Sequence, residues 1–472
     1  MARLTVGSKK FICTIILLSF AALPGLLTLN LRTAGVFLLC VYSACAVMWL
    51  AVTHNPLSLF LMFFTYCMLC NAGQVILYTF GIDFDNFANI YVDYYPGTLR
   101  KALIFQAQCV IYLTCGAILS YKPYTAKRIL KNIGSSRLRG LDFIYILFLA
   151  SMISTYACKL ICRTKMSYGE FFYCKKGGGT GADARLRLMF YATMYLSCFH
   201  HRQDRFYAFI VVSGFVLGVM MLLVGTRSLI IPLISGPLFI RGVMCVKMRF
   251  QKLPLAALCP IALLMILRVV KIVRLYSFDE LSADIVASSV SEGAAENLKN
   301  ILAEMGSSAD CLAETVKQFD RTDCAHSTTV TYSILKTFLP VNVLEFLGVE
   351  PPGSLSRWVT SAGGGREASW GCSVFAEMYA NFGEYGYLSM LPFGYFWVKL
   401  ERRAAVLMRR KPFLAMAVVY LLSYCIFLAR AETMLAVTLA RYCIYVAVLS
   451  SVKIKLRWGP NCGCCPSTMR DG

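Results

Sequence analysis

The chain of 472 residues contains few charged side chains. They make up 15% of the sequence, well below the roughly 25% that is usual for a soluble domain. Apolar residues account for 58%, and the mean hydropathy is +0.62. This balance excludes a soluble enzyme of several domains and a disordered chain. Apolar runs recur from Phe11 to Val452, so a protein with one membrane anchor is excluded as well.

The apolar runs also lack the alternation of polar and apolar residues that marks a transmembrane β-strand. Continuous runs of about 20 apolar residues suit membrane-spanning helices, which rise about 1.5 Å per residue. We therefore predict an all-α polytopic integral membrane protein with about 12 spans, or 10 if the two shortest do not cross. The clear candidates are 11–29, 34–52, 56–80, 102–120, 141–160, 206–224, 412–428 and 434–452, and the weaker ones are 188–199, 229–240, 253–267 and 385–398.

Positive charge is concentrated in the segments that this topology predicts on the inner side of the membrane. If the N-terminus is inside, the inner segments hold 25 of the 47 Lys and Arg residues but only 3 of the 25 Asp and Glu residues. Their net charge then equals the +22 of the whole chain. Basic residues accumulate in short cytoplasmic loops, so this distribution predicts that both termini are cytoplasmic. The basic loops are explained by topology and anionic lipid headgroups, and no nucleic-acid partner is expected.

The predicted topology divides the chain into four parts. Residues 1–267 form an N-terminal bundle of about nine spans, and 268–384 form a large, helical outer loop between the ninth and tenth spans. Residues 385–452 form the C-terminal spans, and 453–472 form a cytoplasmic tail. Within the outer loop, 329–349 is apolar enough to lie at the membrane surface, with Pro340 interrupting it.

Ionisable residues at the ends of the spans are the candidate functional groups, because charges near the bilayer are costly. Glu377, Asn381 and Glu384 are spaced to share one helix face. Arg441 is expected to form a buried ion pair, with Glu432 as one candidate partner. Several arginines fall on the predicted outer side, namely Arg163, Arg227, Arg274, Arg366 and Arg430.

The chemistry of these arginines indicates an anionic ligand at the outer membrane surface. A guanidinium group presents a planar fork of donors that matches phosphate oxygens. A lipid-linked pyrophosphate carries such oxygens at headgroup level, and its sugar–phosphate bond leaves charge on the pyrophosphate when it breaks. Fixed arginines would stabilise that charge without a metal, while a carboxylate accepts a proton from the acceptor hydroxyl.

Two motifs resemble a known family. Residues 371–386 read Gly-Cys-Ser-Val-Phe-Ala-Glu-Met-Tyr-Ala-Asn-Phe-Gly-Glu-Tyr-Gly, and 225–228 read Gly-Thr-Arg-Ser. The longer motif resembles the signature region of O-antigen polymerases of the Wzy type, and the shorter one is similar to their Gly-x-Arg turn. The number of spans and the large outer loop match the same family in architecture.

The resemblance implies a function and a set of site residues. The family moves a growing glycan en bloc from undecaprenyl pyrophosphate onto a new lipid-linked repeat unit at the outer face of the bacterial inner membrane. It implies no cofactor, no metal and no nucleotide sugar. Arg227 and Glu377 are then the catalytic candidates, and Asn381 and Phe382 bind substrate. Arg163, Arg274, Arg366 and Arg430 join the substrate site by placement alone. Expected partners are the lipid-linked oligosaccharide, membrane lipids, a chain-length regulator and a flippase.

Two other functions stay open. Asp83 and Asp85 form a D-x-D sequence on the outer side, which would suit a metal-dependent glycosyltransferase with a lipid-phosphate sugar donor. A lipid-linked oligosaccharide flippase or other transporter is the second alternative. No internal repeat is visible, however, and the charges cluster at the outer mouth, whereas transporters tend to have paired halves and a site at the bilayer midplane.

Most of the 21 cysteines lie inside predicted spans, where cysteine behaves as a small apolar residue. Cys311 and Cys324 share the outer loop and could pair there. Cysteines in the C-terminal tail are too few for a zinc site.

Overall fold

A computed structural model of the chain describes eleven segments. They cover residues 6–26, 30–82, 95–122, 140–164, 181–200, 205–224, 229–244, 294–321, 328–362, 372–408 and 411–451. All regular structure in these segments is helical, as the sequence predicts, and they contain no strand.

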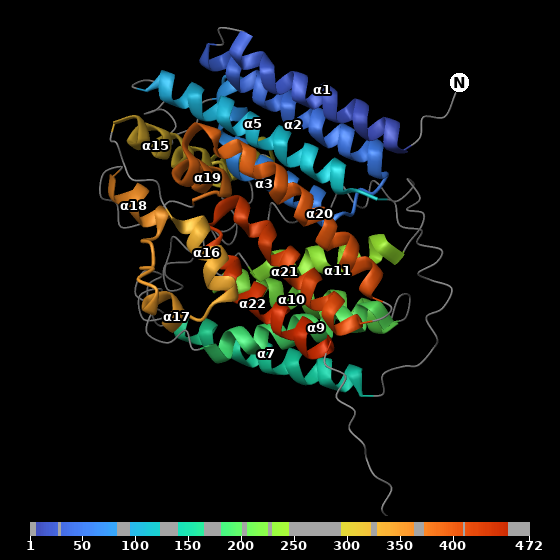
Figure 1. The fold of residues 1–472 in the computed structure, drawn as a ribbon. Helices are drawn as coiled ribbons and strands as arrows, with labels where there is room; N and C mark the ends of the chain where they lie inside the picture. The colour runs from blue at the N-terminus through green and yellow to red at the C-terminus, as the bar shows by residue number, and fades with distance from the viewer. Residues whose placement is uncertain are drawn as a thin grey trace, which may run out of the picture.

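One group of helices is built around α5 (Pro96–Ser120), which begins with proline in its first turn. It packs against α1 (Val6–Leu26), α2 (Leu31–Thr53) and α20 (Met390–Leu407), and α3 (Leu59–Thr79) packs on α2. Figure 1 shows α1, α2, α5 and α20 running side by side. Polar side chains cap two of these helices: Asn30 accepts from the N–H of Thr33 at 2.8 Å, and Ser58 accepts from that of Leu61 at 3.2 Å.

Two glycines bring α5 and α20 unusually close together. A Cβ atom on Gly116 would overlap the carbonyl group of Leu391, and one on Gly394 would overlap that of Leu113. Only glycine lets two helix backbones approach this closely, which is a common device in membrane helix packing. The pair therefore fixes where α20 lies on the central helix.

The second group of helices contains α7 (Leu141–Thr164), α9 (Gly181–His200), α10 (Arg205–Leu223) and α11 (Ile230–Met244). Helix α9 packs against α7 and α11, and α21 (Pro412–Cys425) packs against α9, α11 and α20. Helix α21 thus connects the two groups, and its 3-10 extension η4 (Ile426–Arg430) reaches α3. The last helix, α22 (Met434–Ser451), packs on α21.

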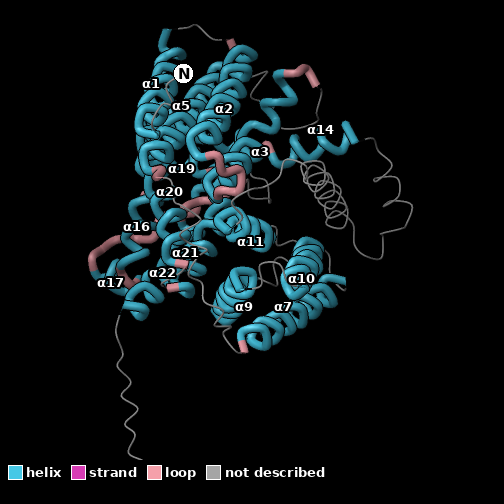
Figure 2. Tube along the Cα trace, turned by 90° about the vertical axis from the view of Figure 1, so that its right-hand side faces the viewer, coloured by secondary structure: helices cyan, strands magenta, loops and turns pink. Residues whose placement is uncertain are grey.

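Short helices gather at one end of this bundle, which we call the loop end (Figure 1). They are α14 (Ala294–Met305), α15 (Ser308–Arg321), α16 (Thr329–Phe338), α17 (Val341–Phe346), α18 (Leu355–Ala362) and α19 (Val374–Phe382). Figure 2 shows α14 beside α3, and residues of these two helices are in contact. The break between α16 and α17 falls at Pro340, as predicted, because proline cannot donate a backbone hydrogen bond.

Six helical segments are long and apolar enough to cross a membrane. They are Leu31–Thr53, Leu59–Thr79, Pro96–Ser120, Leu141–Arg163, Arg205–Leu223 and Pro412–Arg430. Shorter apolar stretches occur at Lys10–Ala21 and Ile230–Val243. The count of about twelve spans and the four-part division of the chain stay predictions, and the candidate span 253–267 lies outside the described segments.

Candidate functional site

Glu377 lies in the first turn of α19 with its side chain fully buried. Ser373 caps this helix by accepting a hydrogen bond from the N–H of Ala376 at 3.3 Å. The Glu377 carboxylate accepts two hydrogen bonds from Thr433, one from its N–H at 2.7 Å and one from its hydroxyl at 2.8 Å. The two donors fix the carboxylate at the start of the last helix, α22.

Burial raises the pKa of the Glu377 carboxyl to about 7. The neighbouring Glu432 carboxylate acts in the same direction, whereas hydrogen bonds from Thr433 and Thr329 oppose the rise. A carboxyl group with a pKa near 7 exchanges protons readily at neutral pH, as a general base must.

Asn381 lies one turn after Glu377 and bonds to two helices. Its amide group donates to the carbonyl of Glu377 at 2.7 Å and to the hydroxyl of Thr329 at 2.9 Å, and its oxygen accepts from the N–H of Val330 at 3.1 Å. The side chain thus joins α19 to the first turn of α16. These protein contacts use most of its bonding capacity.

The sequence predicts that Glu377, Asn381 and Glu384 share one helix face, but in the structure only Glu377 and Asn381 do so. Gly383 follows Phe382 with a φ of 59°, and the chain continues as the 3-10 helix η3 (Gly383–Ser389). Glu384 therefore leaves the face of Glu377 and Asn381, and its exposed carboxylate pairs with Lys101 on α5 at 2.6 Å. Phe382 is 41% exposed at the end of α19, so it presents an aromatic ring at the surface.

The turn 430–433, between η4 and α22, contacts most of the loop-end helices. Arg430 donates to the carbonyl of Glu304 at 3.4 Å and to the hydroxyl of Ser307 at 3.3 Å, where α14 meets α15. Glu432 accepts from the hydroxyl of Ser354 at 2.9 Å and from the N–H of Ser356 at 2.7 Å, at the start of α18.

Thr433 completes these contacts. Besides holding Glu377, its hydroxyl lies 3.1 Å from that of Ser333 on α16. Each polar residue of the turn thus holds a different part of the loop end. The expected ion pair between Arg441 and Glu432 is not formed: Glu432 is occupied at α18, and Arg441 donates to the carbonyl of Leu339. That carbonyl follows the last turn of α16 and therefore has no hydrogen-bond partner within the helix.

A family model described as O-antigen polysaccharide polymerase Wzy matches residues 10–457. The chain belongs to this family. Comparisons with curated proteins and with solved structures gave no match. Members of the Wzy family are integral inner-membrane proteins that act on lipid-linked oligosaccharide repeat units to polymerise O-antigen, which agrees with the apolar helices of this chain.

Among the predicted arginines of this Wzy-family chain, two are described and three are not. Arg430 is half-buried in the turn, as given above. Arg163 is 1% exposed in the last turn of α7, in the other group of helices from Glu377. Arg227, Arg274 and Arg366, like Asp83 and Asp85, lie outside the described residues.

The sequence prediction missed two polar groups, one at the loop end and one in the second group of helices. Asp310 is buried in α15, where burial raises its pKa to about 7 despite a hydrogen bond from Gln74. Its position among the apolar residues Ala309, Leu312 and Ala313 could have signalled this burial. Arg187 in α9 hydrogen-bonds to Tyr156 on α7, the helix whose last turn also carries the buried Arg163.

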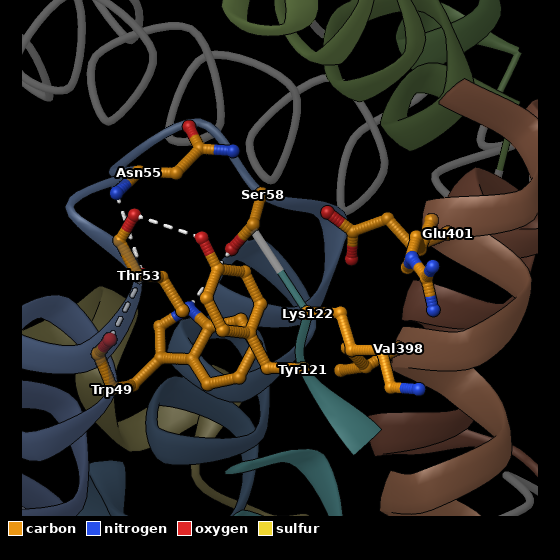
Figure 3. Close-up of a pocket in the computed structure, with 9 residues that line it drawn as sticks. Trp49, Thr53, Asn55, Ser58, Tyr121, Lys122, Val398 and Glu401 are labelled. Atoms are coloured by element: carbon orange, nitrogen blue, oxygen red, sulfur yellow. Dashed lines mark hydrogen bonds between the residues drawn. The ribbon is translucent and has the colours of Figure 1, made fainter. Parts of the chain in front are cut away.

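A small pocket lies around Tyr121 at the C-terminal end of α5 (Figure 3), the end away from the Lys101–Glu384 pair. Its lining includes Trp49, Ser58, Tyr121 and Glu401. The buried Glu401 carboxylate accepts from the N–H groups of Leu59 and Phe60 at 3.2 and 3.0 Å. It thus caps the start of α3, and this structural role accounts for its burial.

Proposed function

We propose that this chain polymerises undecaprenyl-pyrophosphate-linked oligosaccharide repeat units into surface polysaccharide. The growing glycan is transferred en bloc onto a new lipid-linked unit, at the outer face of the cytoplasmic membrane and without a metal. The match of the Wzy family to nearly the whole chain carries this proposal. It is supported by the pKa of about 7 for Glu377, in the segment that resembles the family signature.

In this reaction the acceptor sugar hydroxyl attacks the anomeric carbon of the donor glycan. The hydroxyl proton passes to the Glu377 carboxylate, and the bond to the pyrophosphate breaks with its electrons staying on the phosphate oxygen. Arg227 and the other outer arginines, Arg163, Arg274, Arg366 and Arg430, stabilise that charge. Asn381 and Phe382 complete the substrate site in this scheme.

The burial of Glu377 adds a requirement to the reaction. The carboxylate lies beneath Thr433, which also contacts Ser333 on α16. An acceptor hydroxyl can reach it only when α16 or the turn 430–433 moves. Opening of the loop end is therefore part of the proposed catalytic cycle.

The loop end faces the outer side of the membrane in this proposal, and both termini are cytoplasmic. The distribution of charge supports this orientation: the inner segments carry the whole net charge of +22 under the predicted topology. A chain-length regulator and a flippase are the proposed protein partners.

A deletion strain tests the function and separates it from transport. Loss of a polymerase leaves surface glycan of one repeat unit, whereas loss of a flippase leaves none at the surface. We expect wild type to restore long chains, while Arg227→Ala and Glu377→Ala proteins, still inserted in the membrane, leave single units. Normal chain length in either variant removes that residue from the mechanism.

A purified reaction tests the remaining alternative. Protein and lipid-linked repeat units are mixed without nucleotide sugar, with and without EDTA. We expect longer chains in both samples. Activity that disappears with EDTA and with Asp83→Asn would instead favour a metal-dependent glycosyltransferase.

A further inference from the structure

Two cysteines meet at the loop end, beside the proposed catalytic carboxylate. Cys311 lies in α15, and Cys372 lies two residues before α19. Both are buried, at 0% and 1% exposure, in the same core, and α15 packs directly against α19. Both cysteines are free thiols in the structure, and the Cys311 side chain is a hydrogen-bond partner of the Cys372 thiol. Two cysteines on directly packed elements whose side chains face each other in this way are candidates for a disulfide bond.

The location of the pair distinguishes it from the other buried cysteines. Cys67 and Cys109, for example, lie within α3 and α5, two of the helices able to cross a membrane. Cys311 and Cys372 instead belong to the predicted outer loop, 268–384. Thiols on the outer side of a bacterial inner membrane meet an oxidising compartment, where disulfides form and persist.

We propose that Cys311 and Cys372 are joined by a disulfide bond in the mature protein, made by exchange with an oxidised dithiol protein of the periplasm. Each thiol loses its proton as the new S–S bond forms. The two electrons and two protons pass to the disulfide of the oxidant, which becomes a dithiol. This inference rests on the outer placement of the loop end in the proposed function.

The burial of the pair sets when the bond forms. Thiol–disulfide exchange requires an accessible thiolate, and neither sulfur is accessible after α15 packs on α19. The hydrogen bond to Cys311, together with burial, also raises the pKa of the Cys372 thiol, which disfavours the thiolate. Oxidation therefore precedes the packing of these two helices and is slow in the folded protein.

The bond acts on the position of Glu377. Cys372 is the neighbour of Ser373, the cap of α19, and Glu377 follows one turn later. A link to α15 fixes the start of α19 while α16 and the turn 430–433 remain free to move. The disulfide thus holds one side of the site during the opening that the reaction requires.

Disulfide mapping of the full-length protein tests the proposal directly. Membranes are dissolved in denaturant that contains an alkylating reagent, so that buried free thiols are trapped, and the purified protein is digested with trypsin without reduction. Cleavage after Lys and Arg places Cys311, Cys324 and Cys372 in three separate peptides, 300–317, 322–336 and 367–399. We expect a linked pair of 300–317 with 367–399 that separates on reduction. Alkylated Cys311 and Cys372 in most molecules, or a link from Cys311 to Cys324, would overturn the proposal.

Serine variants give a second, independent measurement. Cys311→Ser, Cys372→Ser and the double variant should lower the melting temperature equally, since each removes the same bond. Because the buried bond becomes accessible only as the protein unfolds, reductant present during melting should lower the melting temperature of the wild type but not of the double variant. Cys198→Ser, in α9, is the matched buried control and should keep the sensitivity of the wild type to reduction. Equal sensitivity of the double variant would contradict the disulfide.

The two proposals fail separately. If the protein makes long chains but mapping finds Cys311 and Cys372 alkylated, the proposed polymerase function stands and the proposed disulfide is wrong. If mapping finds the linked peptides but the protein does not polymerise repeat units, the proposed disulfide stands and the proposed function is wrong.

Discussion

At the residue scale, Glu377 shows how burial can bring the pKa of an acidic side chain close to neutral pH. It is fully buried, yet its carboxylate has two donors from Thr433 and no guanidinium partner among its hydrogen bonds in the described chain. Without a positive partner, the cost of burying the charge dominates, so its pKa rises to about 7. An ion pair with arginine would instead have lowered the pKa and made the group a poor base.

Removing the carboxylate should abolish most polymerisation. Because a positioned general base contributes roughly 10²- to 10⁴-fold, we expect Glu377→Gln to reduce the rate of chain growth by about that factor. Chain length is measured on surface glycan and with purified protein. Glu384→Gln is the control, since Glu384 is exposed and paired with Lys101. A Glu377→Gln protein as active as the control would exclude Glu377 as the base.

The rate should also depend on pH in one direction. A base works only when deprotonated, and the pKa of Glu377 is about 7. The initial rate should therefore fall as the pH is lowered through about 7, with the midpoint near that value. A profile that is flat from about pH 6 to about pH 8 would assign proton transfer to another group.

At the scale of elements, the turn 430–433 organises the loop end. Its three polar residues contact the α14–α15 junction, α18, α16 and α19. Such a short segment can coordinate these helices because it lies at the end of the bundle, between η4 and α22. A movement of the turn would change all of these contacts together.

Thr433 links this turn to the chemistry. Thr433→Val keeps the shape of the side chain and removes the hydroxyl that donates to Glu377 at 2.8 Å. A lost hydrogen bond to a charged group costs about 1.5 kcal/mol or more, so the carboxylate becomes harder to ionise. We expect the midpoint of the pH profile to move upward by about one pH unit. Thr433→Ser retains the hydroxyl and should retain the wild-type profile. An unchanged midpoint in the valine variant would show that this hydroxyl does not control the base.

The close packing of α5 and α20 makes a stability prediction at the same scale. Gly394→Ala would place a methyl group against the carbonyl of Leu113, and backbone cannot yield as a side chain can. We expect a loss of about 1–3 kcal/mol of stability, measured as a lower melting temperature in detergent. Gly97→Ala, on α5 itself, meets nothing within 4 Å and is the control. Equal melting temperatures in the two variants would contradict the observed packing.

At the scale of the whole molecule, the loop-end helices and the pocket around Glu401 lie at opposite ends of the bundle. The charge distribution predicts that the loop end is outside. Cys311 is unsuitable for testing this orientation, because it is fully buried in α15. Introduced cysteines at exposed positions are needed instead.

Glu350 and Arg403 are exposed at the two ends of the molecule. In intact cells, a thiol reagent that cannot cross the membrane should add label to Glu350→Cys above the wild-type level. Arg403→Cys, at the end of α20, should gain label only after the membrane is permeabilised. The reverse pattern would invert the topology.

Much of this architecture could be predicted from sequence because hydrophobic periodicity and length are local signals. The apolar runs predicted α2, α3, α5, α7, α10 and α21 as helices able to cross a membrane. The break at Pro340 was equally local. Glu384 was misplaced because helical spacing assumes that the helix continues, whereas Gly383 ends it with a positive φ.

Composition and local sequence patterns establish a helical membrane protein, and the signature at 371–386 indicates its family. These properties depend on composition and on residues close together along the chain. The partners of Glu377, Asn381, Glu432 and Cys311, in contrast, emerge only from the packing of the helices. Their partners lie tens to hundreds of residues away, and burial and hydrogen bonding depend on which helices pack together.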